Sequence, residues 1–171
     1  MPSGGTKGIQ TRSKERQLRS AAEKGDDKEV RKQISEGTDI NARNDDGWNS
    51  LTLAVNNGRY TTVLLLLGRV NHSWQAPGIV TKNESLTIAV QKLDVRLVEL
   101  LLKNGASPDA RNDQLVTVLM RAAYLGSPEI MEILLDAGAD QTAVDSDGYS
   151  VRHWAHKADC MKCLELVKQR N

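Results

Sequence analysis

The sequence lacks several features that define large classes of proteins. It has no phenylalanine and only two cysteines, Cys160 and Cys163, which are too few and too close together to staple a secreted fold. Its longest aliphatic run, residues 63–67, is far shorter than the roughly 20 residues that span a bilayer. The N-terminal residues include no apolar stretch typical of a signal peptide. We therefore expect a soluble protein inside the cell, in the cytoplasm or the nucleus, with reduced thiols.

The sequence also has almost no net charge. Its 23 basic residues are nearly balanced by 22 acidic ones, which gives a formal charge of +1. Such a balance produces no overall attraction to nucleic acid or to an anionic membrane. The kind of partner must therefore be inferred from local surfaces.

Signatures of catalysis are missing as well. The chain has three histidines, His72, His153 and His156, and it contains no G-x-S-x-G, H-E-x-x-H or phosphate-binding glycine loop. Many carboxylates gather in short segments such as residues 44–46 and 145–147, where turn and capping roles suffice. We expect no enzyme activity, no cofactor and no small-molecule substrate.

What the sequence does have is self-similarity at a nearly fixed period. Its units are marked by five alanines that lie 33, 35, 33 and 33 residues apart, namely Ala21, Ala54, Ala89, Ala122 and Ala155. Three residues before these alanines stand leucines in every unit but the last, which has Arg152. Each unit reads as a helix, a tight turn, a second helix and a loop. A pair of short helices cannot bury its apolar face alone, so neighbouring units must stack.

The turn between the two helices of a unit has its own signal. Gly25, Gly58 and Gly126 stand four residues after the alanine, while Leu93 and Asp159 are the departures. Glycine at this point can adopt the left-handed conformation that ends a helix. We predict second helices at residues 29–35, 61–67, 95–103, 129–136 and 161–168, with Pro128 near a helix start.

In combination these features resemble the ankyrin repeat family. The resemblance rests on the period, on stretches near the family's T-P-L-H-x-A motif such as NSLTLA at residues 49–54, on the leucine runs, and on loops such as GADQTA at residues 138–143. The motif's proline is missing from every copy. The resemblance implies an all-α solenoid of stacked helix-turn-helix repeats with short hairpin-like loops.

The expected organisation follows from this resemblance. Residues 1–12 are expected to form a disordered basic tail. The repeat domain covers residues 13–171, with an N-terminal cap repeat at 13–45, repeats at 46–80, 81–113 and 114–146, and a C-terminal cap repeat at 147–171. An irregular loop at residues 68–83 carries two extra residues together with Trp74, which either anchors the loop or meets a partner.

The resemblance also implies a function in recognition. In such arrays the loop tips and the exposed sides of the first helices line one concave face that binds a protein or peptide. Transferred to this sequence, the family's contact columns are Arg43, Asp45, Asp46, Trp48, Asn56, Asn57, Asn83, Gln91, Lys92, Arg111, Asp113, Gln114, Val116, Tyr124, Leu125, Tyr149 and Lys157. Aromatic side chains flanked by charged ones are typical of interface hot spots. We predict an adaptor, scaffold or inhibitor with protein partners and no membrane contact, monomeric unless its end caps pair.

Two other interpretations stay open. A set of imidazoles and thiols near the C-terminus could bind zinc, or the two thiols could act as a redox dithiol: His153, His156, Cys160 and Cys163. His153 also falls on the family's structural histidine, which by resemblance hydrogen-bonds within and between units. Basic residues near the N-terminus could contact the phosphates of a nucleic acid or an acidic partner, although acidic residues interrupt them: Lys7, Arg12, Lys14, Arg16 and Arg19. Trp154, in the last first helix, could cover the open end of the stack.

Overall fold

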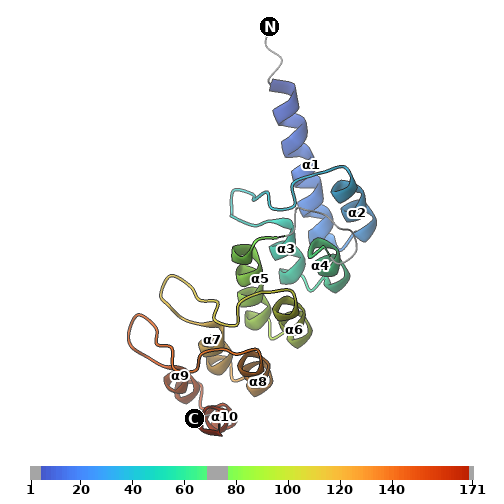
Figure 1. Cartoon of the computed structure of the whole chain (residues 1–171). Coiled ribbons are helices and arrows are strands. Elements are labelled where there is room, and N and C mark those ends of the chain that lie inside the picture. Colours follow the sequence, from blue (N-terminus) through green and yellow to red (C-terminus); the bar gives the residue numbers. More distant parts are fainter. Residues whose placement is uncertain (1–4, 69–76, 170–171) are drawn as a thin grey trace. The chain divides into compact units, whose positions relative to one another are not determined.

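The computed structural model describes residues 5–68 and 77–169, and within these ranges its regular elements are all helices (Figure 1). The expected all-α fold of helix-turn-helix repeats is confirmed. The helices are α1 (Gly5–Lys24), α2 (Asp27–Ser35), α3 (Ser50–Asn56), α4 (Tyr60–Leu66), α5 (Ile79–Gln91), α6 (Val95–Lys103), α7 (Val118–Tyr124), α8 (Pro128–Asp136), α9 (Val151–Lys157) and α10 (Met161–Gln169).

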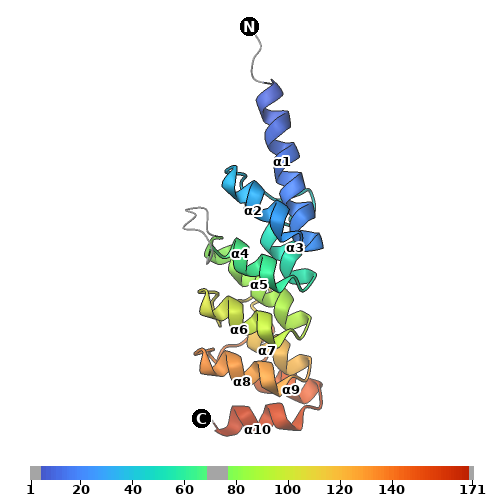
Figure 2. The ribbon, with the colours of Figure 1, turned by 90° about the vertical axis from the view of Figure 1, so that its right-hand side faces the viewer.

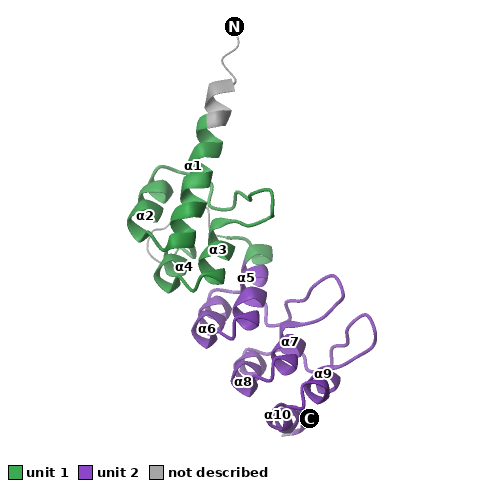
Figure 3. Ribbon diagram, turned by 180° about the vertical axis from the view of Figure 1, so that it is seen from behind, with its two compact units in different colours: residues 1–81 green, residues 82–171 purple. Residues whose placement is uncertain are grey.

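The chain divides into two compact units (Figure 3). Unit 1 is Met1–Thr81 and unit 2 is Lys82–Asn171, so the border falls inside α5. Each unit has its own set of buried leucines and alanines.

Unit 1 consists of two helical layers. α1 packs on α3 to form the layer of first helices, and α2 packs on α4 to form the layer of second helices. Leu18 and Leu51 are buried in the first layer, where Ala21 and Ala54 let the helices approach closely. Burying each leucine contributes roughly 1.5–3 kcal/mol, so the stacking of two pairs stabilises helices that are short on their own.

Unit 2 repeats this arrangement with more members. α7 packs on α9, while α8 packs on both α6 and α10, so that α6, α8 and α10 follow one another in a row (Figure 2). Leu119, Ala122 and Ala155 are buried between the layers. Arg152, which takes the place of a leucine in the last copy, is exposed.

The ends of the second helices agree with the sequence pattern within two residues. Three of these helices begin with a side-chain cap, since Asp26, Asp94 and Ser127 each accept a hydrogen bond from the backbone N–H three residues later. Pro128 occupies the first turn of α8, as expected. Caps of this kind satisfy N–H groups that have no partner inside the helix.

The turn between paired helices keeps one backbone conformation whatever residue occupies it. Gly25, Gly58 and Gly126 have φ values of 80°, 64° and 66°. Leu93 and Asp159 adopt the same left-handed conformation with φ values of 56° and 55°. The two departures from glycine therefore preserve the turn, but at the backbone cost that a Cβ atom imposes there.

Two helices begin earlier than predicted. α1 begins at Gly5, inside the segment expected to be a disordered tail. Residues 5–24 contain no proline, and good helix formers from Lys14 onward let the helix propagate toward the N-terminus. α5 begins at Ile79, inside the expected irregular loop, where Thr81 is buried and its Oγ1 accepts from Asn49 Nδ2 at 3.4 Å. His72 and Trp74 lie outside the described residues.

Candidate functional site

The loops that lead into α3, α7 and α9 share one hairpin geometry. In the first, the Asn44 side-chain Oδ1 accepts hydrogen bonds from the backbone N–H groups of Asp46 and Trp48, at 3.1 Å and 2.8 Å. The Asn44 N–H donates to the Trp48 carbonyl at 2.9 Å, which closes the base of the hairpin. The loop tip projects beyond the helices of unit 1 (Figure 1). The turn role that the sequence suggested for this segment is confirmed.

Asn112 and Asp145 play the same part in the two hairpins of unit 2. Asn112 Oδ1 accepts from Gln114 and Val116 N–H, and Asp145 Oδ1 accepts from the Asp147 and Tyr149 N–H groups. These tips extend on one side of unit 2 (Figure 1). Unit 2 therefore presents two similar loop tips side by side, joined by a hydrogen bond from Ser146 N–H to the Gln114 carbonyl at 3.0 Å.

The Asp145 carboxylate does more than close its hairpin. Its second oxygen, Oδ2, accepts a hydrogen bond from Trp154 Nε1 at 2.9 Å. Burial raises the pKa of this carboxyl, but the hydrogen bonds from Tyr149 N–H, Trp154 Nε1 and Asp147 N–H outweigh burial and hold the pKa below its ordinary value. A charged Asp145 thus fixes both the loop and the Trp154 ring.

Unit 1 contains an open groove of about 1210 Å³ between α1, α3 and the hairpin loop. Its lining residues come from these three elements: Arg12, Glu15, Arg16, Arg19, Ser20, Glu23, Arg43, Asn44, Asp45, Asp46, Trp48, Leu53 and Asn56. We call it the unit 1 groove. Trp48 and Leu53 are half-buried apolar surfaces within an otherwise polar lining.

Charge is arranged along the walls of the unit 1 groove. Arg12, Arg16 and Arg19 recur at helical spacing, so they share one side of α1. The opposite wall carries Asp45 and Asp46 at the loop tip. Arg19 Nη1 donates to the Ala42 carbonyl at 3.1 Å, which ties α1 to the start of the loop. Arg43 Nη1 likewise donates to the Gly47 carbonyl at 2.7 Å. The loop is therefore held in place before any partner arrives.

The sequence-predicted residues of the second repeat fall mostly into this groove. Its lining includes Arg43, Asp45, Asp46, Trp48 and Asn56. Asn57 lies outside the lining and has a structural part, because its Nδ2 donates to the Leu53 carbonyl at 2.9 Å and it caps α3.

Sequence reasoning missed the α1 wall of the groove. Glu15, Ser20, Glu23 and Leu53 were not proposed as contacts, and the arginines were considered for phosphate or an acidic partner but not as part of this face. The signal that could have revealed them is the spacing of residues 12, 16, 19 and 23, which places them on one helical face once α1 is extended. A polar helix shows little apolar periodicity, so the sequence pattern did not reveal that α1 extends toward the N-terminus.

The basic residues near the N-terminus do not form a uniform positive surface. Lys14 Nζ pairs with the Glu36 carboxylate at 2.7 Å, and this hydrogen bond lowers the pKa of Glu36. Glu15 and Glu23 lie among the arginines of the groove. The side chain of Lys7 lies outside the described residues. The positive charge of this region is thus interleaved with negative charge.

Unit 2 carries an aromatic cluster formed by Tyr124, Trp154 and Lys157. The Tyr124 and Trp154 rings meet edge to face with centroids 5.5 Å apart. Lys157 Nζ lies 5.8 Å from the Tyr124 centroid and 5.3 Å from that of Trp154. Trp154 therefore packs between α7 and α9 instead of covering the end of the stack. Nearby, Tyr149 stacks on His153 at a centroid distance of 3.9 Å.

The remaining predicted residues of unit 2 are spread over two areas. Arg111, Asp113 and Gln114 are exposed at a loop tip, with Val116 half-buried beside them. Other predicted residues lie at helix ends, namely Gln91 as the last residue of α5, Lys92 directly after it, and Leu125 at the C-cap of α7. Asn83 has a structural role, because its Oδ1 accepts a hydrogen bond from Ser107 N–H at 2.8 Å.

The two cysteines differ from the sequence expectation of reduced thiols. Cys160 and Cys163 form a disulfide, because a separation of three residues at a helix start brings their Cα atoms to 5.2 Å. His153 is engaged with Tyr149, and among the described residues no group of three or more His, Cys, Asp or Glu side chains could hold a metal ion. The four residues of the zinc alternative are therefore not assembled into a site.

Within the described ranges, none of the helices combines the length and apolar character needed to cross a membrane.

Comparison with known proteins adds the family. The model of the family described as ankyrin repeats (3 copies) matches residues 18–112 and 86–171. The chain is 33% identical over 111 residues to the ankyrin repeat, SAM and basic leucine zipper domain-containing protein 1 of Microcebus murinus, a match that covers 61% of the chain and 23% of that protein. The protein of the same name from Otolemur garnettii is 29% identical over 144 residues, which covers 81% of the chain and 27% of that protein.

A fungal relative shows a similar level of identity. The ankyrin repeat domain-containing protein SAT10 of Stachybotrys chartarum is 31% identical over 122 residues, 63% of the chain and 6% of that protein. The chain spans about a quarter of the length of the two mammalian relatives. The repeated helical pairs and the family match over residues 18–171 lead to one conclusion: the chain belongs to the ankyrin repeat family.

Proposed function

We propose that the chain is a protein-interaction module that binds a partner protein or peptide through the loop-tip side of its repeats. Ankyrin repeats are generally protein-interaction modules and a fold without catalysis, so the family favours protein partners. The observation that carries the proposal is the unit 1 groove, because it combines a loop tip, a helix wall and a half-buried tryptophan in one open surface.

The chemistry of the unit 1 groove supports binding to a polypeptide. Trp48 offers a flat apolar contact, and aromatic side chains surrounded by polar ones tend to dominate binding free energy. Arginines on one wall and aspartates on the other can pair with side chains of either sign, which sets the orientation of a bound segment. Small-molecule pockets are more enclosed and more apolar than this groove.

The aromatic cluster of unit 2 supports a second contact area. Tyr124 has 41% of its surface exposed, while its ring is already held by Trp154. Trp154 is in turn held by Asp145 through its indole N–H. Side chains that are fixed beforehand lose little freedom on binding, so this area can contribute to affinity at low entropic cost.

The wider role that we propose is that of an adaptor, scaffold or inhibitor in the cytoplasm or the nucleus, which acts by binding and not by chemistry. The partner would be a protein or a peptide. Each of the two areas supplies charged groups next to an aromatic ring, a combination suited to the mixed surfaces of folded proteins and of charged peptides.

Affinity capture with paired variants tests the proposal. The double variant Trp48→Ala/Tyr124→Ala removes the central aromatic ring of both areas, so we expect it to lose the partner that the wild type retains. The matched control, Glu132→Ala/Lys162→Ala, changes two exposed residues at a pocket between α8 and α10 and should retain the partner. Circular dichroism checks that both variants keep their helices. Equal capture by the wild type and the aromatic variant would refute the assigned surface.

A further inference from the structure

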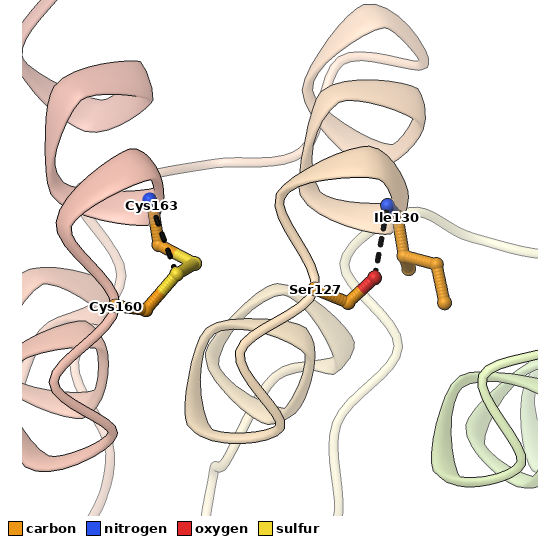
Figure 4. The surroundings of a disulfide bond; sticks show 4 residues. All are labelled: Ser127, Ile130, Cys160 and Cys163. Carbon is orange, nitrogen blue, oxygen red and sulfur yellow. Dashed lines mark hydrogen bonds between the residues drawn. A yellow bond between two sulfur atoms is a disulfide. The ribbon is translucent and has the colours of Figure 1, made fainter.

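The disulfide sits at the point where the last helix begins. Cys160 immediately precedes α10, the position that Ser127 holds before α8 (Figure 4). Cys160 Sγ accepts a hydrogen bond from Cys163 N–H at 3.2 Å, and Ser127 Oγ accepts one from Ile130 N–H at 3.4 Å. The sulfur therefore occupies the N-cap place that an oxygen takes in the preceding repeat.

The two sulfur-bearing residues differ in exposure. Cys163 is fully buried, with 0% of its surface accessible, whereas Cys160 is only partly buried. Thiol–disulfide exchange requires that the attacking thiolate reach one sulfur of the bond. Of the two residues only Cys160 has accessible surface, which favours its sulfur as the point of attack.

A disulfide between residues three apart does little as a staple. The stabilisation by a disulfide grows with the length of the loop that it closes in the unfolded chain, and this loop is among the shortest that can form. The first turn of α10 is also ordered by its own hydrogen bonds, such as that from Leu164 N–H to the Cys160 carbonyl at 3.1 Å. A bond that adds little stability, is partly accessible and lies in a Cys-x-x-Cys motif has the features of an exchangeable one.

We propose that Cys160 and Cys163 form a thiol–disulfide exchange site that reacts with low-molecular-weight thiols such as glutathione, with Cys160 as the attacked sulfur. A glutathione thiolate attacks Cys160 Sγ, the bond between the two cysteine sulfurs breaks, and Cys163 leaves as a thiolate that takes up a proton. A second glutathione thiolate attacks the glutathione sulfur of the mixed disulfide and releases Cys160 and glutathione disulfide. Two glutathione thiols are thereby oxidised and one protein disulfide is reduced.

The same site runs in the opposite direction. The reduced Cys160 thiolate would lie at the start of α10, where the Cys163 N–H and the positive end of the helix dipole stabilise negative charge. It attacks glutathione disulfide and releases one glutathione thiolate; Cys163 then displaces the second and re-forms the bond. The site does not depend on the proposed partner surface, because it is built from the start of α10.

Reduction of the disulfide should be measurable in the structure next to the turn between α9 and α10. Asp159 joins α9 to α10 in a left-handed conformation with a φ of 55°, where a residue with a Cβ atom is strained. In the oxidised protein the covalent bond fixes the first turn of α10 directly after this residue. We therefore expect reduction to accelerate amide hydrogen exchange locally, at Cys163 and Leu164, and to leave both the global stability and the first turn of α8 unchanged.

Single-cysteine variants test the assignment. Cys163→Ser and Cys160→Ser are each incubated with glutathione disulfide, and mass spectrometry follows the addition of one glutathione. Cys163→Ser leaves the accessible thiol and should react on the order of tenfold faster than Cys160→Ser, which leaves the buried one. Serine at position 160 can cap α10 as Ser127 caps α8, so the slow variant should keep its fold.

Trapping in the wild type provides the second measurement. Brief exposure to reduced glutathione, a quench with an alkylating reagent and peptide mapping should place glutathione on Cys160 and the alkyl group on Cys163. Equal rates for the two serine variants, glutathione found mainly on Cys163, or a wild type that excess glutathione fails to reduce would each overturn the proposal.

Discussion

The two units share a core plan and differ in the surface that they build on it. In both, leucine and alanine columns pack first helices on one another, and hairpin loops project beside them. Unit 1 adds a long first helix, α1, of 20 residues, whereas α7 and α9 of unit 2 have 7 residues each. α1 supplies one wall of a charged groove, and its extra turns contribute Arg12, Glu15 and Arg16 to that wall. In unit 2 the described first helices α7 and α9 carry an aromatic cluster instead.

This difference teaches which positions of a repeat are free to vary. The buried columns are alike because each must fit the neighbouring pair, so changes there alter stability. The loop tips and the outer side of the first helices do not have to fit a neighbouring pair, so the two units differ there. Unit 1 carries arginine and aspartate at these positions, whereas unit 2 carries tyrosine, tryptophan and lysine. Substitutions in the shared core should therefore alter stability alike in both units, whereas substitutions on the divergent surface should not.

The largest effects are expected from the shared core. Leu51→Ala in unit 1 and Leu119→Ala in unit 2 each remove a side chain that is 1% exposed. Each should lower the free energy of unfolding by about 2–5 kcal/mol, because lost burial and a cavity both contribute. Urea denaturation measures the loss. Val144→Ala, at a residue 52% exposed, is the control and should stay near wild type. A much smaller loss of unfolding free energy at one of the two leucines than at the other would show that the cores of the two units are not equivalent.

Intermediate effects are expected at the turn between paired helices. Gly126→Ala places a Cβ atom at a φ of 66°, in a space with no heavy atom within 4 Å, so the backbone alone determines its cost. It should lower the free energy of unfolding by about 1–2 kcal/mol. Leu93→Gly, at the matching turn, relieves the same strain and should raise stability or leave it unchanged. Thermal melts that rank these two variants the other way would contradict a common turn conformation.

Removal of a helix cap should lower the free energy of unfolding by less than the changes above, and by a similar amount in the two units. Asp26→Ala removes the cap of α2 in unit 1, and Asp94→Ala removes that of α6 in unit 2. Each substitution should cost about 1 kcal/mol, since one backbone N–H loses its partner. Chemical denaturation measures both. Asn at either position keeps an accepting oxygen and should recover most of the loss; failure of that rescue would point to charge and not capping as the cause.

The smallest effect is the dependence of stability on pH that Asp145 contributes in unit 2. The folded pKa of Asp145 lies below its ordinary value of 3.8, so its charged form stabilises the fold. That contribution is complete above the ordinary pKa and is lost as the pH falls through the lowered folded value. Asp145→Asn keeps one accepting oxygen for the hairpin, as Asn44 and Asn112 do in the other hairpins, and cannot ionise, so it should lose less stability as the pH falls below 3.8. Parallel acid curves for variant and wild type would argue against this role.

Much of the fold was predictable because repetition multiplies weak signals. A single Gly-Ala-Asp means little, but five aligned alanines located the units, and the second helices followed within two residues. The left-handed turn was also predictable from glycine at three of its five positions. What failed was the start of α1 and of α5, because polar helical turns next to an irregular segment leave no apolar period to read.

The candidate site was predictable in part for the same reason. Contact columns transferred from the family identified Trp48 and the aspartates of the unit 1 groove, since loop tips keep their place in every repeat. They did not identify the α1 wall, because the contact columns were transferred only to the units after the N-terminal cap repeat, in which most of this wall lies. The disulfide was missed because residue spacing alone does not determine whether two nearby thiols are oxidised.

Hydrogen exchange of the complex with a captured partner tests the central claim most directly. If the loop-tip side is the binding surface, the partner should slow exchange in residues 43–48 and at the α1 side of the unit 1 groove, and leave α2 and α4 unchanged. Protection confined to α2 and α4, with residues 43–48 exchanging as in the free chain, would contradict the account.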